Sequence, residues 1–223
     1  RRDGREIPVV LQGTKTGMLF VLNRETGVPV FPVEERPVPA SDVPGERASP
    51  TQPFSALRLS PHRLSADDAW GLTPADRAWC RDRMAGLRNE GIFTPPSLKG
   101  TLVVPSNIGG AHWGGVAFDP ERQIVVVPVN RVAAVVQLIP REELDSARAR
   151  QRRGERVDGD WEYASMRGTP YGMRRHILRN PQVALLGESY QLDPGVPKFY
   201  TESSLLDMWL NFGVLGPAIV LAL

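Results

Sequence analysis

The fold is decided by the stretch GTKTGMLFVLNRETG, residues 13–27, in which two turns that end in glycine follow each other across one apolar run. Residues 18–22 are apolar and partly aromatic, which predicts a short strand. Asn23 starts the second turn because its side chain can accept hydrogen bonds from the amides that follow, and Gly27 can adopt a positive φ there. Two further apolar runs flank the stretch, at residues 7–12 and 28–33. The sequence therefore predicts an antiparallel meander.

Short strands are also predicted after residue 100. The apolar runs lie at residues 100–106, 114–120, 124–130 and 134–140. A tight turn is expected at Asp119-Pro120-Glu121-Arg122, between the second and third of these runs. The segment 34–63 is dense in proline, which fixes φ and removes an amide donor, so we expect it to be extended and irregular.

One long helix is predicted in the middle of the chain. Thr73 is its expected N-cap, with Pro74 at the first helical position and Asp76 at the capping-box position. Gly91 is the expected C-terminal stop. An apolar stripe at helical spacing is formed by Cys80, Met84 and Leu87.

Two later segments leave alternatives open. Residues 141–160 mix acidic and basic side chains, which indicates either an exposed helix or a flexible insertion, with a solvated face favoured over a nucleic-acid patch. Residues 208–223 are apolar and uncharged, but shorter than the roughly 20 residues of a spanning helix. We expect a buried strand or docked segment there, with a transmembrane anchor as the alternative.

Composition narrows the function classes. The 27 basic and 25 acidic residues leave a net charge of +2, which does not favour a nucleic-acid partner. Cys80 is the only cysteine, so no intrachain disulfide can form, and it is expected to be a packed core residue. His62 and His176 show no spacing typical of metal ligands and are expected to be incidental, so no metal ligand is predicted. The first ten residues carry no initiator Met and no signal peptide, which leads us to expect that the chain starts within a domain.

Five strings follow each other along the chain: GTKTGMLFVLNRETG (13–27), ERASPTQPF (46–54), DAWGLTPADRAWCRDRMAGLRNEGIFTPPSLKGTLVVPS (68–106), HWGGVAFDPERQIVVVPVN (112–130) and GTPYGM (168–173). Together they resemble the membrane-bound quinoprotein dehydrogenases of the glucose, quinate and shikimate type, which depend on pyrroloquinoline quinone (PQQ). The resemblance implies an all-β fold, a partial β-propeller of the eight-bladed quinoprotein type with one inserted helix. The short strands and turns agree with such blades.

The resemblance also implies a division of the chain. Residues 1–173 would form a partial propeller of about three to four blades, at roughly 40–50 residues each, with the helical insertion near 65–91. Residues 174–223 would be a diverged C-terminal segment. Phe31 takes the place of the tryptophan that usually wedges between blades in the family. Since the family ring has eight blades, this chain alone is not expected to close it.

The function implied by the resemblance is PQQ-dependent oxidation of a sugar or polyol alcohol, such as glucose or quinate, with electrons passed to ubiquinone. A Ca or Mg ion would accompany PQQ in the complete enzyme. The expected location is the periplasmic face of the bacterial inner membrane, with membrane association through a missing N-terminal region. The family's Asp base would lie upstream of this chain, so we expect an inactive fragment. The alternative is a non-catalytic β-repeat binding or scaffold module that has lost the cofactor.

Three residues match cofactor-binding positions of the family. Lys15 would donate to the quinone oxygens, where an ammonium stabilises growing negative charge; the alternative is a surface lysine. Asn130 would donate from a neutral amide, and the alternative is an Asx turn after a strand. Trp113, flanked by glycines that permit close approach, would wall the planar cofactor, with core packing as its alternative. His112 is expected to be structural.

Overall fold

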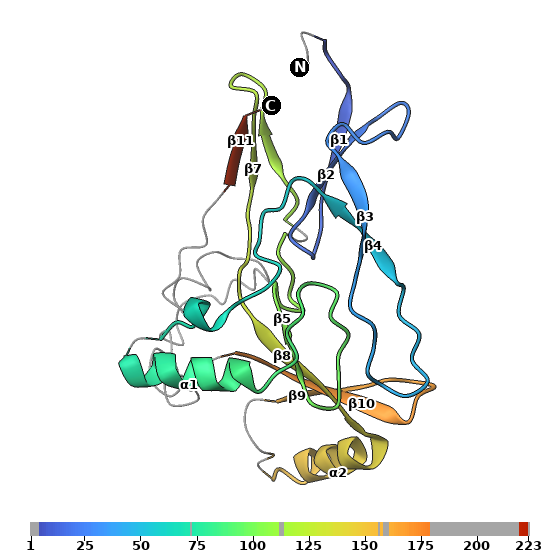
Figure 1. Ribbon diagram of the computed structural model, residues 1–223, viewed down its shortest axis with the longest axis vertical. Helices are drawn as coiled ribbons and strands as arrows, with labels where there is room; N and C mark the ends of the chain where they lie inside the picture. The colour runs from blue at the N-terminus through green and yellow to red at the C-terminus, as the bar shows by residue number, and fades with distance from the viewer. Residues whose placement is uncertain are drawn as a thin grey trace.

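The computed structural model describes residues 5–71, 73–111, 114–155, 157 and 161–178, together with the backbone of residues 219–222. Within these residues, short strands form separate antiparallel sheets, and two α-helices lie on one end of the molecule (Figure 1). The sheets do not close into a ring in the described part of the chain. A mostly β fold with open sheets is what a partial propeller requires.

The first sheet confirms the hairpin predicted from residues 13–27. Strand β1 (Val9–Gly13) pairs antiparallel with β2 (Leu19–Asn23). The Asn23 Oδ1 accepts from the amides of Glu25 (2.8 Å) and Thr26 (3.1 Å), and Gly27 has a φ of 74°. The side chain of Asn23 and the backbone freedom of Gly27 thus close the turn as predicted.

The prediction of a third meander strand at residues 28–33 is wrong. Residues 28–33 contribute only an isolated bridge between Leu22 and Pro29. The next strand is β3 (Val33–Pro37), which pairs with β4 (Thr51–Ser55) inside the segment predicted to be irregular. Proline is compatible with this sheet because, with two strands only, each strand keeps one edge unpaired.

The remaining strands of the described residues form two sheets. The order in one is β5 (Thr101–Val103), β8 (Ala134–Pro140), β10 (Tyr171–Ile177) and β9 (Glu162–Ser165). The order in the other is β11 (Ile219–Ala222), β7 (Ile124–Val127) and β6 (Ala117–Asp119). Strand β8 has the predicted bounds. The predicted tight turn between β6 and β7 is also present, and the Asp119 carboxylate closes it by accepting from the amides of Glu121 and Arg122.

The predicted C-terminal elements are only partly covered by the structure. The backbone of residues 219–222 is a strand paired with β7, as expected for part of the apolar segment 208–223, and the rest of that segment lies outside the described residues. The boundary predicted at residue 173 falls within β10. No described helix combines the length and apolar character needed to cross a membrane.

Helix α1 (Pro74–Ala85) begins as predicted and ends earlier. The Thr73 hydroxyl accepts from the Asp76 amide at 3.1 Å, and the Asp76 carboxylate accepts from the Thr73 amide at 3.1 Å. The helix stops at Ala85, with Gly86 as C-cap, so the predicted stop at Gly91 is wrong. The reason is tertiary, because Arg88 exchanges backbone hydrogen bonds with Gly100 (2.9 Å) and Leu102 (2.9 Å) and leaves the helical path.

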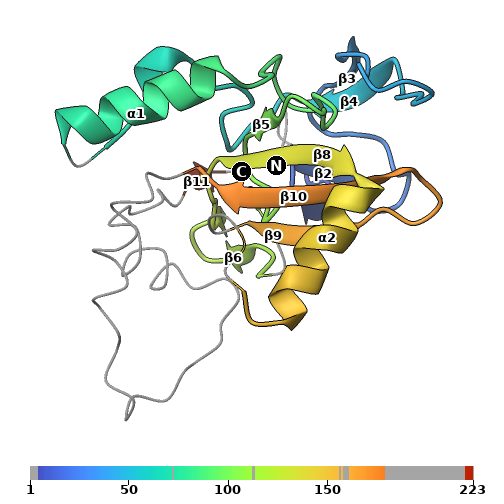
Figure 2. The same cartoon turned by 90° about the horizontal axis from the view of Figure 1, so that it is seen from below.

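A second helix, α2 (Arg141–Arg152), occupies the charged segment. Of the two alternatives for this segment, the helix is therefore the correct one, and the described part of the chain has two α-helices where one inserted helix was predicted. Leu144 and Ala147 are buried, so the helix is not solvated all round. Figure 2 shows α2 lying across strands β9 and β10.

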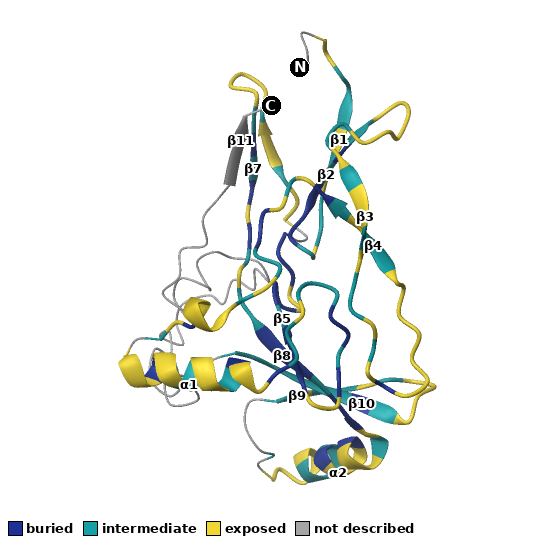
Figure 3. Cartoon of the chain, in the orientation of Figure 1, coloured by how far each residue is buried: buried dark blue, intermediate teal, exposed yellow. Residues whose placement is uncertain are grey.

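Among the described residues, two apolar clusters form the core (Figure 3). The first, which we call the hairpin cluster, contains Leu19, Val21, Leu59, Ala111, Val125, Val127 and Val129, and Phe31 packs against it. The second contains Ala69, Met84, Leu87, Leu102 and Val135, with Cys80 packed against it. The three residues of the predicted apolar stripe meet in this cluster, although Leu87 lies beyond the end of α1. Burial also raises the pKa of the Cys80 thiol, in keeping with a packed residue.

Candidate functional site

Three segments that are distant in sequence, those of the Lys15 turn, Ser60 and Asn130, converge on Gly110. The Gly110 amide donates to the Lys15 carbonyl at 2.8 Å, and the Gly110 carbonyl accepts from the Asn130 amide at 2.7 Å. The neighbouring Ala111 amide donates to the Thr14 carbonyl at 3.2 Å. Gly110 therefore binds the backbones of two predicted cofactor-binding residues, one on each side.

Close contact at Gly110 is possible only because it has no side chain. A Cβ at this position would lie 2.6 Å from the Gly17 Cα and 2.9 Å from the Ser60 Oγ. Real Cβ atoms do not approach backbone so closely, so any larger residue would push the segments apart. The glycines before Trp113 were predicted to allow close approach, and at Gly110 the partner that approaches is the turn carrying Lys15.

The turn at residues 14–17, between β1 and β2, is held from several sides. The Gly17 amide donates to the Thr14 carbonyl at 2.9 Å, and the Thr14 hydroxyl donates to the Met18 carbonyl at 2.8 Å. The Gly17 carbonyl accepts from the Leu59 amide at 2.8 Å. These bonds fix the backbone from which the exposed Lys15 side chain projects.

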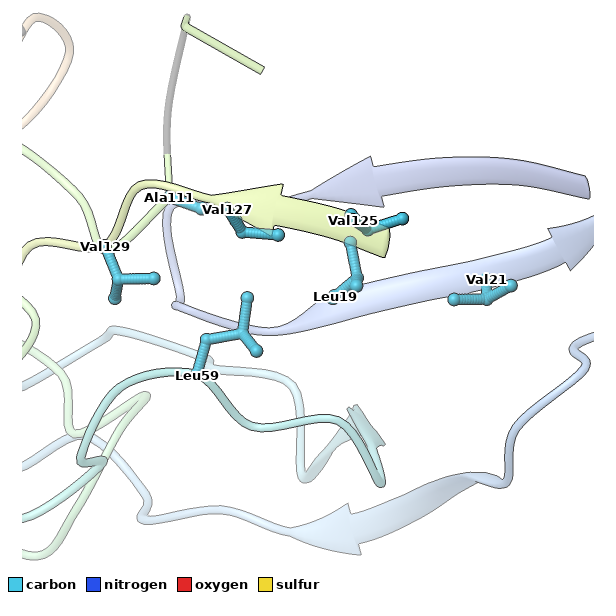
Figure 4. Close-up of a cluster of buried hydrophobic side chains, with 7 residues drawn as sticks. All are labelled: Leu19, Val21, Leu59, Ala111, Val125, Val127 and Val129. Atoms are coloured by element: carbon cyan, nitrogen blue, oxygen red, sulfur yellow. The ribbon is translucent and has the colours of Figure 1, made fainter. Parts of the chain in front are cut away.

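The hairpin cluster contains the sequence neighbours of the residues that meet at Gly110. Figure 4 shows Leu19, Leu59, Ala111 and Val129 gathered from separate segments. Each of these apolar residues is adjacent to, or within two positions of, a residue of the site, so packing fixes the backbone hydrogen bonds described above.

Asn130 forms the Asx turn that was the alternative to a cofactor role. Its Oδ1 accepts from the Val132 amide at 2.7 Å. The Nδ2 donor has no hydrogen-bond partner among the described residues. The two interpretations are therefore compatible, because the oxygen holds the turn while the NH₂ group is left to donate elsewhere.

Ser60 and His62 were not predicted to belong to the site. The buried Ser60 donates from its Oγ to the Asn130 carbonyl at 3.2 Å. His62 donates from Nε2 to the Thr16 carbonyl at 3.0 Å, a structural contact with the Lys15 turn that the sequence did not predict. Neither position carries a sequence signal, since one serine and one histidine beside a proline are common in loops. His176 lies elsewhere, edge-on to Trp161 in the β9–β10 region, at 4.1 Å between ring centroids.

Two residues considered in the sequence analysis lie outside the part of the chain that the structure describes. Trp113 and His112 lie outside the described residues, so the prediction that Trp113 shares the site remains a prediction. In the described part of the chain, no group of three or more His, Cys, Asp or Glu side chains is placed to hold a metal ion.

Comparison with known proteins gives the family. A family model described as the β-propeller domain of PQQ-dependent glucose/ethanol/alcohol dehydrogenases matches residues 1–189. The chain belongs to this PQQ dehydrogenase family. No solved structure matches the chain.

Several curated relatives of the PQQ family are similar to the chain. It is 45% identical to a quinoprotein glucose dehydrogenase of Gluconobacter oxydans over 63% of this chain and 18% of the relative. It is 39% identical to quinoprotein glucose dehydrogenase A of Acinetobacter calcoaceticus over 81% of this chain and 23% of the relative. It is 35% identical to a quinate/shikimate dehydrogenase (quinone) of Acinetobacter baylyi over 86% and 24%. The chain thus spans about a fifth to a quarter of the length of these relatives.

The donor set at Gly110 fits PQQ, the cofactor of the family. The quinone oxygens and carboxylates of PQQ accept hydrogen bonds, and the site offers donors. The Lys15 side chain forms no ion pair or hydrogen bond with any described residue, and the Asn130 Nδ2 is likewise without a partner there. A cation and a neutral amide, on two segments joined through Gly110, are suited to an anionic quinone.

Proposed function

We propose that this chain is part of a PQQ-dependent dehydrogenase that oxidises a sugar or polyol alcohol, such as glucose or quinate. The observation that carries the proposal is the double backbone contact of Gly110 with Lys15 and Asn130. It brings a lysine and an asparagine that match family cofactor positions to one point of the fold. Their juxtaposition does not follow from their separation in sequence.

Each residue has a defined role in the proposal. PQQ supplies the two-electron acceptor for alcohol oxidation when it is bound. The Lys15 ammonium stabilises negative charge that grows on a quinone oxygen, and the Asn130 Nδ2 donates to the cofactor without taking up a proton. Ser60 and the Asx turn of Asn130 hold the amide in place.

We further propose that the rest of the site comes from a longer protein. An Asp base and the remaining propeller blades would lie outside this chain, and a Ca or Mg ion would bind with PQQ in the complete enzyme. The short coverage of the relatives supports this part. Electrons would pass to ubiquinone at the periplasmic face of the inner membrane, to which a region outside this chain would anchor the enzyme. The name of the quinate/shikimate relative, which specifies a quinone, supports the acceptor class.

The test is a spectroscopic titration with PQQ in the presence of Ca²⁺ or Mg²⁺, followed by dye-coupled oxidation of glucose and quinate. We expect weak binding and no turnover with the 223-residue chain, because binding energy is lost when part of a site is absent. We expect tight binding and turnover when the chain is joined to the upstream blades of a relative. Failure of that completed protein to bind PQQ would refute the proposal and favour the scaffold alternative.

A further inference from the structure

The turn that carries Lys15 has one carbonyl held by a side chain. The carbonyls of Thr14, Lys15 and Gly17 all accept from backbone amides. The Thr16 carbonyl accepts no backbone amide in the described part of the chain and accepts instead from the Nε2 of His62 at 3.0 Å. His62 therefore completes the set of contacts around the residue next to Lys15.

The surroundings of His62 fix its tautomer. Because a carbonyl can only accept, Nε2 must carry the proton. Nδ1 is buried and has no hydrogen-bond partner among the described residues, while the Phe54 ring lies edge-on at 6.1 Å between ring centroids. A proton on Nδ1 would be a buried donor without an acceptor, so the neutral ring with the proton on Nε2 is the favoured form. Burial accordingly lowers the pKa of His62.

The ring is also held in place from behind. The Phe54 ring that contacts His62 makes an edge contact with Phe93, at 5.5 Å between centroids. Phe93 has a φ of 67°, a left-handed conformation that is unfavourable for a bulky residue and persists only where the surroundings enforce it. The contacts of the Phe54 and Phe93 rings keep the imidazole directed at the Thr16 carbonyl.

We infer that His62 is a positioning residue for Lys15, which acts by holding the Thr16 carbonyl and so fixing the direction in which the lysine leaves the turn. The inference rests on the proposed role of Lys15 toward PQQ. His62 itself need not touch cofactor or substrate.

The first experiment uses the 223-residue chain without cofactor. Nitrogen-15 NMR of the imidazole should show a protonated Nε2 and an unprotonated Nδ1 at neutral pH. In His62→Leu, amide exchange at Gly110 and Ala111 should accelerate about five- to tenfold, the effect of losing one hydrogen bond. His62→Gln keeps an NH donor at a similar reach and should exchange nearly as the wild type does. The Leu138 amide, which donates to Ser97 far from the turn, is the internal control.

The second experiment is a double-mutant cycle on PQQ affinity in the completed dehydrogenase. Lys15→Ala alone should weaken binding by about 10- to 100-fold, as expected for a charged hydrogen bond. His62→Leu alone should weaken it about five- to tenfold, and should have almost no effect when Lys15 is already alanine. His176→Gln, in β10, should leave the affinity unchanged.

The outcomes separate the inference from the proposed function. Additive effects of His62→Leu and Lys15→Ala, or acceleration at Leu138 as large as at Gly110, would overturn the positioning role. If Lys15→Ala does not change PQQ affinity, the proposed function fails, whatever the exchange data show. Should His62→Leu not fold, His62→Asn replaces it, since its shorter amide cannot reach the Thr16 carbonyl. Exchange in that variant equal to His62→Gln would also overturn the inference.

Discussion

At the scale of single residues, the site depends on groups that do two tasks at once. Asn130 closes an Asx turn through Oδ1 while its NH₂ group has no partner in the described chain. Gly110 binds the Lys15 and Asn130 backbones through its amide and its carbonyl. Substitutions that remove one task and keep the other can therefore separate stability from cofactor binding.

Asn130 allows such a separation. Asn130→Asp keeps an acceptor for the Val132 amide and loses the NH₂ donor, so we expect near-native stability with PQQ affinity reduced about tenfold or more in the completed enzyme. Asn130→Ala loses both and should also be less stable by about 1 kcal/mol. Urea unfolding and PQQ titration of both variants measure the two effects. Equal PQQ affinity of wild type and Asn130→Asp would show that the asparagine has a turn-forming role only.

Gly110 should tolerate no larger side chain. In Gly110→Ala, the new Cβ would collide with the Gly17 backbone, and we expect a loss of about 1–3 kcal/mol in the free energy of unfolding. Gly86→Ala is the matched control, because its Cβ would find only ordinary contact at 3.6 Å. Chemical denaturation of the two variants gives the comparison, and similar losses for both would contradict the packing argument.

The lowered pKa of His62 predicts that the free energy of unfolding depends on pH. Its pKa in the folded chain lies below the ordinary 6.5, first because of burial. As the pH falls through 6.5, the unfolded chain takes up a proton that the folded chain resists, so the free energy of unfolding decreases. The contribution is complete above 6.5 and is lost toward the folded pKa. In urea unfolding from pH 8 to 5, the free energy of unfolding of the wild type should therefore fall relative to that of His62→Gln, which has no titrating group at this position. A difference that stays constant over that range would contradict the assignment.

At the scale of elements, local sequence decides where helices begin, and long-range contacts decide where they end. The Thr73–Asp76 capping box starts α1 as predicted. Its end at Ala85 follows from the pairing of Arg88 with the residues around β5, which no pattern near residue 88 indicates. Likewise, the charged composition of α2 suggests solvation, whereas its Leu144 is fully buried against the sheet.

The burial of Leu144 predicts that packing of α2 against the sheet contributes to the stability of the fold. Leu144→Ala should lower the free energy of unfolding by about 2–5 kcal/mol, through lost burial and a cavity. The exposed neighbour Asp145 is the control, and Asp145→Ala should change stability by less than about 0.5 kcal/mol. Urea unfolding followed by circular dichroism reports both. A small effect of Leu144→Ala would mean that α2 docks weakly.

At the scale of the whole molecule, the open sheets of the described residues predict that this chain alone gains little stability from PQQ. PQQ stabilises only a state that binds it, by about 2.7 kcal/mol at a concentration 100 times the Kd. We therefore expect PQQ with Ca²⁺ to raise the Tm of the completed dehydrogenase clearly and that of the 223-residue chain hardly at all. Differential scanning calorimetry of both proteins provides the measurement. An equal rise in the two would show that this chain holds a sufficient site.

Local sequence was enough to predict the turn at Asn23 and Gly27, the start of α1 and strand β8, because in each case side chains act on nearby backbone. The family followed from strings spread along the chain. Contacts between distant segments, by contrast, form strands β3 and β4 in a proline-dense segment and place His62 against the Lys15 turn. They also bring Lys15 and Asn130 to one glycine. Such contacts join distant segments, and they exist because burial of a shared apolar cluster brings together residues whose spacing in the sequence carries no sign of it.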